Sequence, residues 1–271
     1  MAEAYSDFAA VYDELMDNIP YDEWFIYLKA LLQEYKIHNG IIVELGCGTG
    51  TLTELLASAG YDMIGIDNAP SMLDIANAKK QVNASSTLYL CQDMREFELF
   101  GTVAAIVSLC DSINYITNLD ELLTVFKLVN NYLDTDGIFI FDFHPKYYYK
   151  EIVADATIAE DRDNISFIWD NYYDDDSDIN ELALSLFIQD TEDETIYRKY
   201  EELHEQRGYT LSEIKELVEK SGLILLAAYD AFTHEPATEE SERIYIIAKE
   251  HTTTGQKKLV ADAYAADQLK I

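Results

Sequence analysis

The sequence is poor in basic residues. It contains 19 Lys and Arg against 51 Asp and Glu, which gives its 271 residues a formal net charge of −32. A surface this negative repels phosphate backbones and anionic membranes, because affinity for nucleic acids depends on clustered Lys and Arg. We therefore expect no nucleic-acid partner. The same charge suits a small neutral or cationic substrate, but acidity that serves solubility alone explains it at least as well.

Cysteine and long apolar runs are also scarce. The three cysteines, Cys47, Cys91 and Cys110, form no CxxC pair, so neither a zinc site nor redox chemistry is indicated. The longest apolar stretches, 103–109 and 223–229, are too short to span a bilayer, and no secretory leader pattern opens the sequence. We expect a cytoplasmic protein without a metal site or a membrane partner.

The sequence does contain a regular alternation of strands and helices. Hydrophobic residues make up 49% of the chain, which is enough for a sizeable core. Short apolar runs separated by amphipathic helices predict strands at 41–43, 63–66, 88–91, 103–109 and 138–143. Such alternation predicts a parallel sheet covered by helices on both faces. Thr51 with Glu54 and Thr210 with Glu213 stand at capping-box spacing, which predicts helix starts there.

The pattern changes after Phe143. Three strands are predicted with no helix between them, at 165–173, 181–189 and 195–207, and they indicate a small antiparallel sheet inserted into the α/β domain. The earlier pattern then returns, with two more strands at 223–228 and 243–248. We predict an α/β domain of residues 37–145 and 209–250, an inserted β lid at 146–208, an aromatic helical segment at 1–36 and a flexible tail at 251–271.

The strongest local signal follows the first strand. Residues 43–50 read Val-Glu-Leu-Gly-Cys-Gly-Thr-Gly, and glycines there let the chain turn sharply and let a ligand approach the backbone. The dinucleotide fingerprint G-x-G-x-x-G would need a glycine in place of Thr51, so an NAD-dependent dehydrogenase is disfavoured. Glu44 ends an otherwise apolar strand, where an unpaired carboxylate is costly. A ligand role for Glu44 is therefore favoured over a structural one.

A tight G-x-G-x-G loop after an acidic strand end resembles the cofactor loop of class I S-adenosylmethionine-dependent methyltransferases. The resemblance implies that Glu44 addresses the ammonium end of the cofactor, that Asp67 accepts the ribose hydroxyls, and that Asp93 accepts the adenine amine. The alternatives are a helix cap for Asp67 and a turn for Asp93. The expected cofactor contacts are Tyr12, Glu44, Gly46, Cys47, Gly48, Gly50, Asp67, Met72, Asp93, Met94, Cys110 and Asp111.

Nearly all of residues 1–250 also resembles the YqeM-type methyltransferases of Gram-positive bacteria. The stretches that carry this resemblance are 12–16, 21–24, 110–115 and 204–207. It implies an α/β fold with a Rossmann-like sheet of seven strands, mostly parallel with the last one or two antiparallel. It also implies helices on both faces of that sheet and a small antiparallel β-sheet over the active site.

Aromatic residues near the N-terminus resemble segments that fold over the cofactor in small-molecule methyltransferases. They are Tyr5, Phe8, Tyr12 and Trp24. Several such families place an arginine near this segment to hold the cofactor carboxylate, whereas the basic residues before this loop are Lys29 and Lys36. The Tyr12 hydroxyl is a candidate substitute, with core packing as its alternative. Core packing is likewise the alternative to an adenine contact for Met72.

The segment after the fourth strand should face the methyl acceptor, because ligands bind at the carboxyl ends of parallel strands. Methyl transfer is an in-line displacement, so the protein mainly aligns the reactants and excludes water. Candidate catalytic residues are Asp111, Tyr115 and His144, and for His144 a bond to loop backbone is the alternative. Candidate substrate contacts are Asn114, Tyr115, Tyr200, His204 and Arg207. Strand alternation puts Tyr200, Glu202, His204 and Gln206 on one face of the lid, which either binds substrate or is solvated.

We therefore hypothesise a methyltransferase that uses S-adenosylmethionine to methylate a nitrogen or an oxygen of a small molecule. The Asn-Pro-Pro-Tyr signature of many nucleic-acid and protein amine methyltransferases is absent, which agrees with the charge. The alternatives are a non-catalytic cofactor-binding protein and a methyltransferase with a tRNA or protein acceptor. A homodimer is compatible with the sequence.

Overall fold

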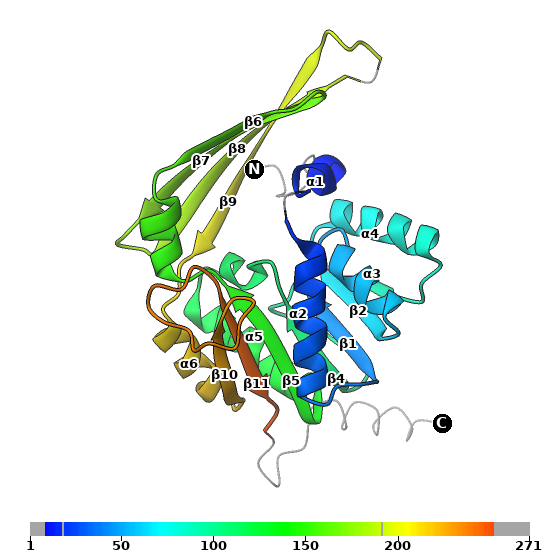
Figure 1. Cartoon of the computed structure of the whole chain (residues 1–271), viewed down its shortest axis with the longest axis vertical. Coiled ribbons are helices and arrows are strands. Elements are labelled where there is room, and N and C mark those ends of the chain that lie inside the picture. The colour runs from blue at the N-terminus through cyan, green and yellow to red at the C-terminus, as the bar shows by residue number, and fades with distance from the viewer. Residues whose placement is uncertain (1–8, 18, 191, 252–271) are drawn as a thin grey trace.

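The computed structural model describes residues 9–17, 19–190 and 192–251. The predicted tail beyond His251 and the aromatic residues Tyr5 and Phe8 lie outside this range. The described residues form a seven-stranded sheet of order β10-β11-β5-β4-β1-β2-β3 and a separate four-stranded sheet of order β6-β7-β8-β9. Figure 1 shows the smaller sheet beyond one end of the larger one, with helix α1 beside it.

The larger sheet has the predicted, mostly parallel arrangement. Its strands are β1 (Ile41–Leu45), β2 (Asp62–Asp67), β3 (Leu88–Cys91), β4 (Val103–Ser108), β5 (Leu133–Phe143), β10 (Ile224–Asp230) and β11 (Ile244–Lys249). Strands β1 to β5 pair in parallel, and β11 is antiparallel to both β5 and β10. The carboxyl ends of β1 to β5 and the beginning of β11 therefore meet at one edge of the sheet.

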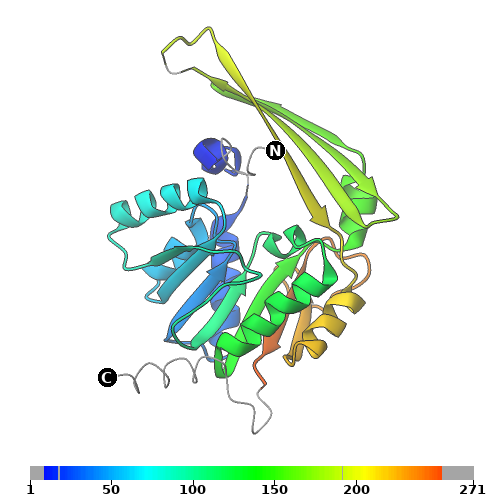
Figure 2. The same ribbon diagram turned by 180° about the vertical axis from the view of Figure 1, so that it is seen from behind.

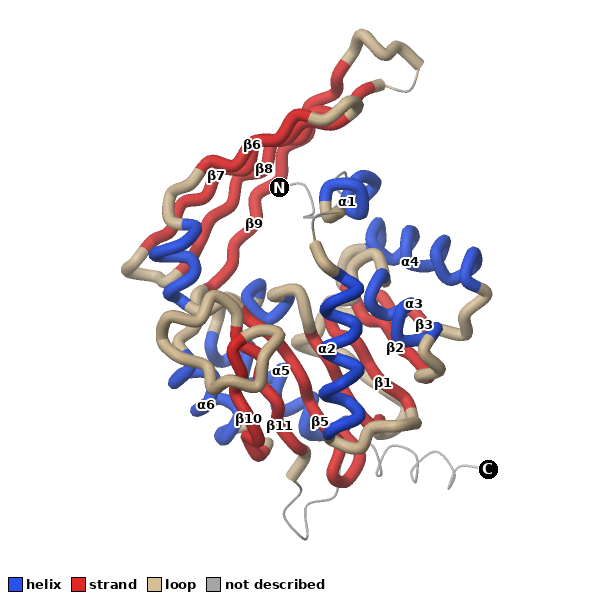
Figure 3. The backbone as a smooth tube through the Cα atoms, in the orientation of Figure 1, coloured by secondary structure: helices blue, strands red, loops and turns tan. Residues whose placement is uncertain are grey.

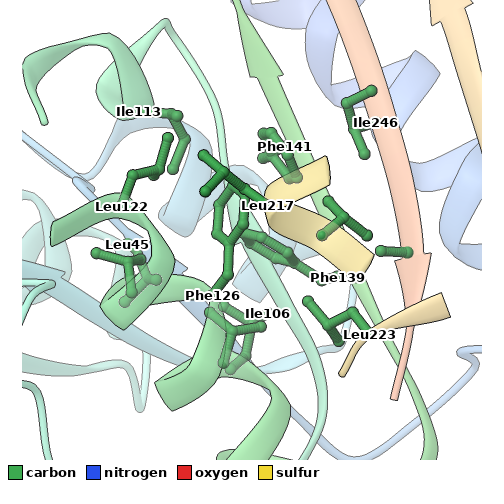
Figure 4. Close-up of a cluster of buried hydrophobic side chains, with 14 of the residues drawn as sticks. Leu45, Ile106, Ile113, Leu122, Phe126, Phe139, Phe141, Leu217, Leu223 and Ile246 are labelled. Atoms are coloured by element: carbon green, nitrogen blue, oxygen red, sulfur yellow. The ribbon is translucent and has the colours of Figure 1, made fainter. Parts of the chain in front are cut away.

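Helices cover both faces of this sheet, as Figures 1 and 2 show from opposite sides. Helices α2 (Tyr21–Glu34) and α3 (Thr51–Ser58) pack on one face, and α5 (Leu119–Tyr132) and α6 (Leu211–Lys220) pack on the other. Helix α4 (Pro70–Asn83) packs beside α3 and against β3. Phe126 of α5 lies against Phe139 and Phe141 of β5, with ring centroids 5.6 and 5.0 Å away (Figure 4).

One of the two predicted capping boxes is present. Thr210 accepts from the Glu213 amide while the Glu213 carboxylate accepts from the Thr210 amide, and together they start α6. The prediction at Thr51 was wrong, because Gly50 is the N-cap of α3 and Glu54 turns away from it. The Glu54 carboxylate instead accepts hydrogen bonds from Asn83, Ser85 and Tyr89. Within the described part of the chain, no helix is long and apolar enough to cross a membrane.

The smaller sheet is an antiparallel meander whose strands fall within the predicted lid range (Figure 3). It comprises β6 (Thr157–Asp161), β7 (Ile165–Asp174), β8 (Ile179–Gln189) and β9 (Tyr197–Arg207). Three strands were predicted, and β6 was missed because its five residues are all exposed and lack apolar alternation. A π-helix, η2 (Tyr148–Val153), leads into this sheet, and a 3₁₀ helix, η1 (Ser112–Tyr115), follows β4.

Helix α1 (Ala9–Leu15) lies between the larger sheet and the lid. On one side, Val11 and Leu15 pack against the inner face of the lid, where Leu182 and Leu184 are buried. On the other side, Ala9 packs against Met72 of α4. The helix therefore bridges the two halves of the molecule.

Candidate active site

A cavity of about 530 Å³ opens at the carboxyl ends of β1, β2 and β4. Helices α1 and α2 reach its rim through Tyr12, Tyr21 and Trp24. Most of the residues predicted to bind the cofactor line it: Tyr12, Glu44, Gly46, Cys47, Gly48, Asp67, Met72, Asp93, Met94 and Cys110. Gly50 and Asp111, which were also predicted there, are not part of its described lining. We refer to this space as the first cavity.

The three glycines of the loop have different physical roles. All three have positive φ, at +71° for Gly46, +52° for Gly48 and +74° for Gly50, where other residues are strained. A Cβ on Gly46 would lie 2.6 Å from the Ser112 Cβ, and one on Gly50 would collide with the Tyr89 ring. A Cβ on Gly48 would meet nothing within 4 Å. Gly48 is thus the loop position where a ligand has room to approach the backbone.

Two carboxylates of the first cavity, one buried and one half-buried, have no cation beside them in the described structure. Glu44 is 4% exposed and accepts a hydrogen bond from the Thr53 hydroxyl. Burial, with the Asp67 charge adding to it, raises the pKa of Glu44 to about 8. The Asp67 carboxylate accepts hydrogen bonds from the backbone amides of Gly48, at 2.8 Å, and Ala69, at 2.9 Å. Partial burial raises the pKa of Asp67 as well. A cationic ligand would favour the ionised form of both groups.

At the predicted adenine end, Asp93 is held by a neighbouring arginine. The Arg95 Nε donates to both carboxylate oxygens, at 3.0 and 3.1 Å, and the Arg95 amide donates to Oδ1 at 2.8 Å. These bonds hold the pKa of Asp93 below its ordinary value. Asp93 is therefore an ionised acceptor with a fixed orientation, and Met94 lines the cavity beside it.

A polar cluster fastens α1 to the glycine loop. The Thr49 hydroxyl donates to Asp13 Oδ1 at 2.7 Å, and Lys79 of α4 forms an ion pair with Asp13 Oδ2 at 2.7 Å. Lys79 also donates to the Thr51 hydroxyl at 2.7 Å. This cluster could not be predicted from the sequence, because it joins three segments that are far apart along the chain.

A second cavity, of about 290 Å³, lies between α1, η1, η2 and the lid. It shares Tyr12, Trp24, Cys110 and Tyr115 with the first cavity, so the two spaces adjoin. Cys110 and Asp111 both have positive φ, of 60° and 52°, and such strained backbone in non-glycine residues is concentrated at functional sites. The turn they form leads the chain from β4 to the boundary between the cavities.

Arg243, which precedes β11, anchors a network at the second cavity. Its Nη1 lies 2.5 Å from Asp142 Oδ2, and its Nη2 lies 2.9 Å from Asp111 Oδ1 and 2.6 Å from His144 Nε2. Because a guanidinium only donates, His144 Nε2 accepts, and Nδ1 carries the ring proton toward the Glu242 carbonyl at 2.7 Å. Burial and Arg243 together lower the pKa of His144 to about 3, so the ring is neutral.

Sequence reasoning missed Arg243, although one signal for it existed. If the final strand is antiparallel, its first residues, and not its last, reach the ligand edge of the sheet. Arg243 stands immediately before that strand. A charged residue at this position was therefore a candidate for the site.

The predicted catalytic and substrate residues fall into two groups. Asp111, Tyr115, His144 and His204 line the second cavity, whereas Asn114, Tyr200 and Arg207 are not in the described lining of either cavity. The Asn114 amide donates to the carbonyls of His144 at 2.8 Å and Arg207 at 2.7 Å, and it thereby ties β5 to β9. The Arg207 side chain lies 3.6 Å from both Asp178 and Glu213.

The polar face of β9 is turned inward. Glu202, His204 and Gln206 are 7%, 4% and 6% exposed, so the alternative of a solvated face was wrong. His204 Nε2 lies 3.2 Å from Glu202 Oε2, and the Gln206 amide donates to Asp111 Oδ2 at 2.8 Å. The lid therefore contributes polar groups directly to the second cavity.

The chain is similar to known methyltransferases in both sequence and structure. Residues 42–137 match the family model described as a methyltransferase domain. The YqeM protein of Bacillus subtilis, whose name describes a methyltransferase, is 35% identical over 92% of this chain and 98% of its own length. An S-adenosylmethionine-dependent methyltransferase from Clostridium acetobutylicum has a TM-score of 0.82 at 27% identity, covering 92% of this chain and 100% of its own. An amino pentose methyltransferase from Micromonospora echinaspora, solved with S-adenosylmethionine bound, has a TM-score of 0.69 at 13% identity, covering 93% and 99%.

Proposed function

Because the chain belongs to the YqeM-type family of class I S-adenosylmethionine-dependent methyltransferases, we propose that it methylates a nitrogen or an oxygen of a small molecule held in the second cavity. When bound, S-adenosylmethionine supplies an electrophilic methyl group on a sulfonium. The protein's own task is then to hold the acceptor in line with that methyl group and to keep water out.

The first cavity fits the cofactor. Gly48 leaves open space beside the backbone, Asp67 presents an oriented carboxylate for the ribose, and Asp93 presents another for the adenine amine. Glu44, whose buried carboxylate is without a cation in the described structure, would meet the ammonium group. In this proposal Gly50 starts α3 and makes no contact with the cofactor.

The single observation that carries the proposal is the boundary shared by the two cavities. A methyl group crosses from donor to acceptor only where the two ligands touch, and Tyr12, Trp24, Cys110 and Tyr115 line both spaces. The second cavity has the volume of a small-ligand site and is roofed by the lid. The amino pentose methyltransferase that shares this fold is itself named for a small acceptor.

Among the predicted catalytic residues, the geometry favours Asp111 and Tyr115. His144 is left out of the proposed chemistry, because its Nε2 lone pair already accepts from Arg243 and its Nδ1 proton is directed to a backbone carbonyl. In this proposal the uncharged His144 ring accepts a hydrogen bond from Arg243 and so holds the guanidinium in place.

The test is transfer of labelled methyl groups from S-adenosylmethionine into three fractions of a bacterial extract: small metabolites, tRNA and protein. We expect label in the metabolite fraction, and none with a Gly48→Val variant that cannot place the cofactor. Label confined to tRNA or protein would overturn the proposed acceptor. Cofactor binding without label in any fraction would support the non-catalytic alternative.

A further inference from the structure

Negative charge predominates around the second cavity. Asp111 and Glu160 line it. Asp142 pairs with Arg243, and Glu202 lies 3.2 Å from His204. Against these four carboxylates the described structure sets two guanidiniums, Arg243 and the Arg162 that pairs with Glu160 at 2.7 Å. Since His144 is neutral, the surroundings keep an excess of negative charge that attracts a cation and repels an anion.

Asp111 is the carboxylate best placed to meet a ligand. It lies at the turn after β4, next to Cys110, which borders both cavities. Arg243 fixes its Oδ1 at 2.9 Å and Gln206 fixes its Oδ2 at 2.8 Å, so the group is oriented before any ligand arrives. Each carboxylate oxygen accepts more than one hydrogen bond, so both keep capacity for a further donor.

Arg243 does not counteract this preference. Its charge is shared by Asp142, which is fully buried, and by Asp111, and its guanidinium stacks 5.0 Å from the Trp24 ring. An anionic ligand would have to compete with two carboxylates already in place. The arginine is therefore a positioning residue for Asp111 and not a receptor for an acid.

The walls of the cavity also suit a cation. Aromatic rings supply much of the lining: Tyr12, Trp24, Tyr115, Tyr148, Tyr149, Phe167 and Trp169. Aromatic faces attract ammonium groups while they exclude water, which strengthens the neighbouring carboxylate. An amine with a compact skeleton matches this combination better than an alcohol of the same shape.

From this arrangement we infer that the methyl acceptor is a small amine whose nitrogen binds at Asp111, with Arg243 and Gln206 holding that carboxylate in place. The inference rests on the proposed function and narrows it to nitrogen as the methylated atom. It assigns the specificity of the second cavity to charge recognition.

Methylation of a bound amine requires one proton acceptor, and Asp111 supplies it. The bound ammonium gives one proton to the Asp111 carboxylate and becomes a neutral amine. Its lone pair then forms the new C–N bond as the methyl–sulfur bond breaks, and that electron pair remains on sulfur. The methylated product is again an ammonium ion, and Asp111 returns its proton to water when the product leaves.

The test uses the full chain and a set of small primary and secondary amines, each paired with the alcohol of the same skeleton. Binding is measured by calorimetry with the demethylated cofactor product present, and methyl transfer is measured with labelled S-adenosylmethionine. We expect methylation of members of the amine series, and at least about tenfold weaker binding of each matched alcohol. Methylation of alcohols or carboxylates with no amine methylated would overturn the inference and leave the proposed function standing.

Two variants isolate Asp111. Asp111→Asn should weaken amine binding at least about tenfold while leaving cofactor affinity unchanged, because Asp111 lies outside the described lining of the first cavity. Asp178→Asn is the matched control, since its side chain is also 20% exposed and also pairs with cations, Lys146 and Arg207, but is in the described lining of neither cavity. An Asp111→Asn protein that kept the wild-type preference for amines over alcohols would overturn the role of Asp111. If that variant does not fold, the wild-type comparison of amines with alcohols still decides the acceptor class.

Discussion

The two cavities of this protein differ in how they are built. The described lining of the first comes mainly from residues 44–116, where strand ends and a glycine loop follow one another along the chain. The second is assembled from α1, η1, η2, all four lid strands and Arg243, which are separated by up to about 230 residues of sequence. The first cavity, the proposed donor half, therefore depends on local backbone geometry, and the second cavity, the proposed acceptor half, depends on tertiary assembly.

This difference separates what the fold keeps fixed from what it can vary. In the proposed function the sheet and its glycine loop constrain the cofactor through φ angles and amide groups, which few substitutions can reproduce. The lid and Arg243 would constrain the proposed acceptor through side chains, which can change without altering the sheet. Substitutions in the two halves should therefore have separable effects.

The largest effect is expected at Arg243. Arg243→Met leaves Asp142 buried without its cation, and breaking such a pair costs about 3–5 kcal/mol of unfolding free energy. Arg198→Met is the control, because Arg198 pairs with Asp190 while 64% exposed, and exposed pairs contribute about 0–1 kcal/mol. Urea denaturation of both variants checks the difference. Equal losses of stability would show that the network at the second cavity is not a structural anchor.

A loss of cofactor affinity of about 100-fold is expected for Gly48→Val. The substitution strains a residue at φ +52° and places a branched side chain in the open space of the first cavity. Gly60→Val also strains the backbone, at φ +96° with nothing within 4 Å, but stands outside the described lining. Calorimetry with S-adenosylmethionine should show normal binding for the Gly60 variant. Normal binding by both variants would remove Gly48 from the site.

The same division explains how far the sequence could be interpreted. Glu44, Gly48 and Asp67 were identifiable because strand, loop and carboxylate are neighbours in sequence, and the structure brings them into one cavity. The place of Arg243 before an antiparallel final strand was a signal for the site, but its partners Asp111 and Asp142 could not be predicted, because they are 132 and 101 residues away and no local pattern connects them. The short strand β6 was missed for another reason, since it is held by pairing with β7 and buries nothing of its own.

A pH dependence is expected for cofactor binding. The pKa of Glu44 is raised to about 8 in the protein, so the residue is largely protonated at neutral pH. A cationic ligand binds best to the ionised form, so binding releases a proton and affinity should rise with pH up to about 8 and then level. The side chain of the Glu44→Gln variant cannot ionise, so its cofactor affinity should not show this rise with pH. The titration of the ligand itself remains in both proteins. Identical pH profiles for the two proteins would exclude an ionic contact at Glu44.

The smallest effect is expected at α1, which belongs to both halves. Asp13 fastens it to the glycine loop, whereas Leu15, 8% exposed, packs against the lid. Leu15→Ala should loosen the lid contact and raise KM for the acceptor a few-fold, because the helix loses packing there but keeps its bonds to Thr49 and Lys79. Leu203→Ala, on the exposed face of β9, is the matched control. It should change neither KM for the acceptor nor the affinity for the cofactor. If Leu15→Ala instead weakened cofactor binding and acceptor binding equally, α1 would act as one rigid cover, and the two cavities would not be separately adjustable.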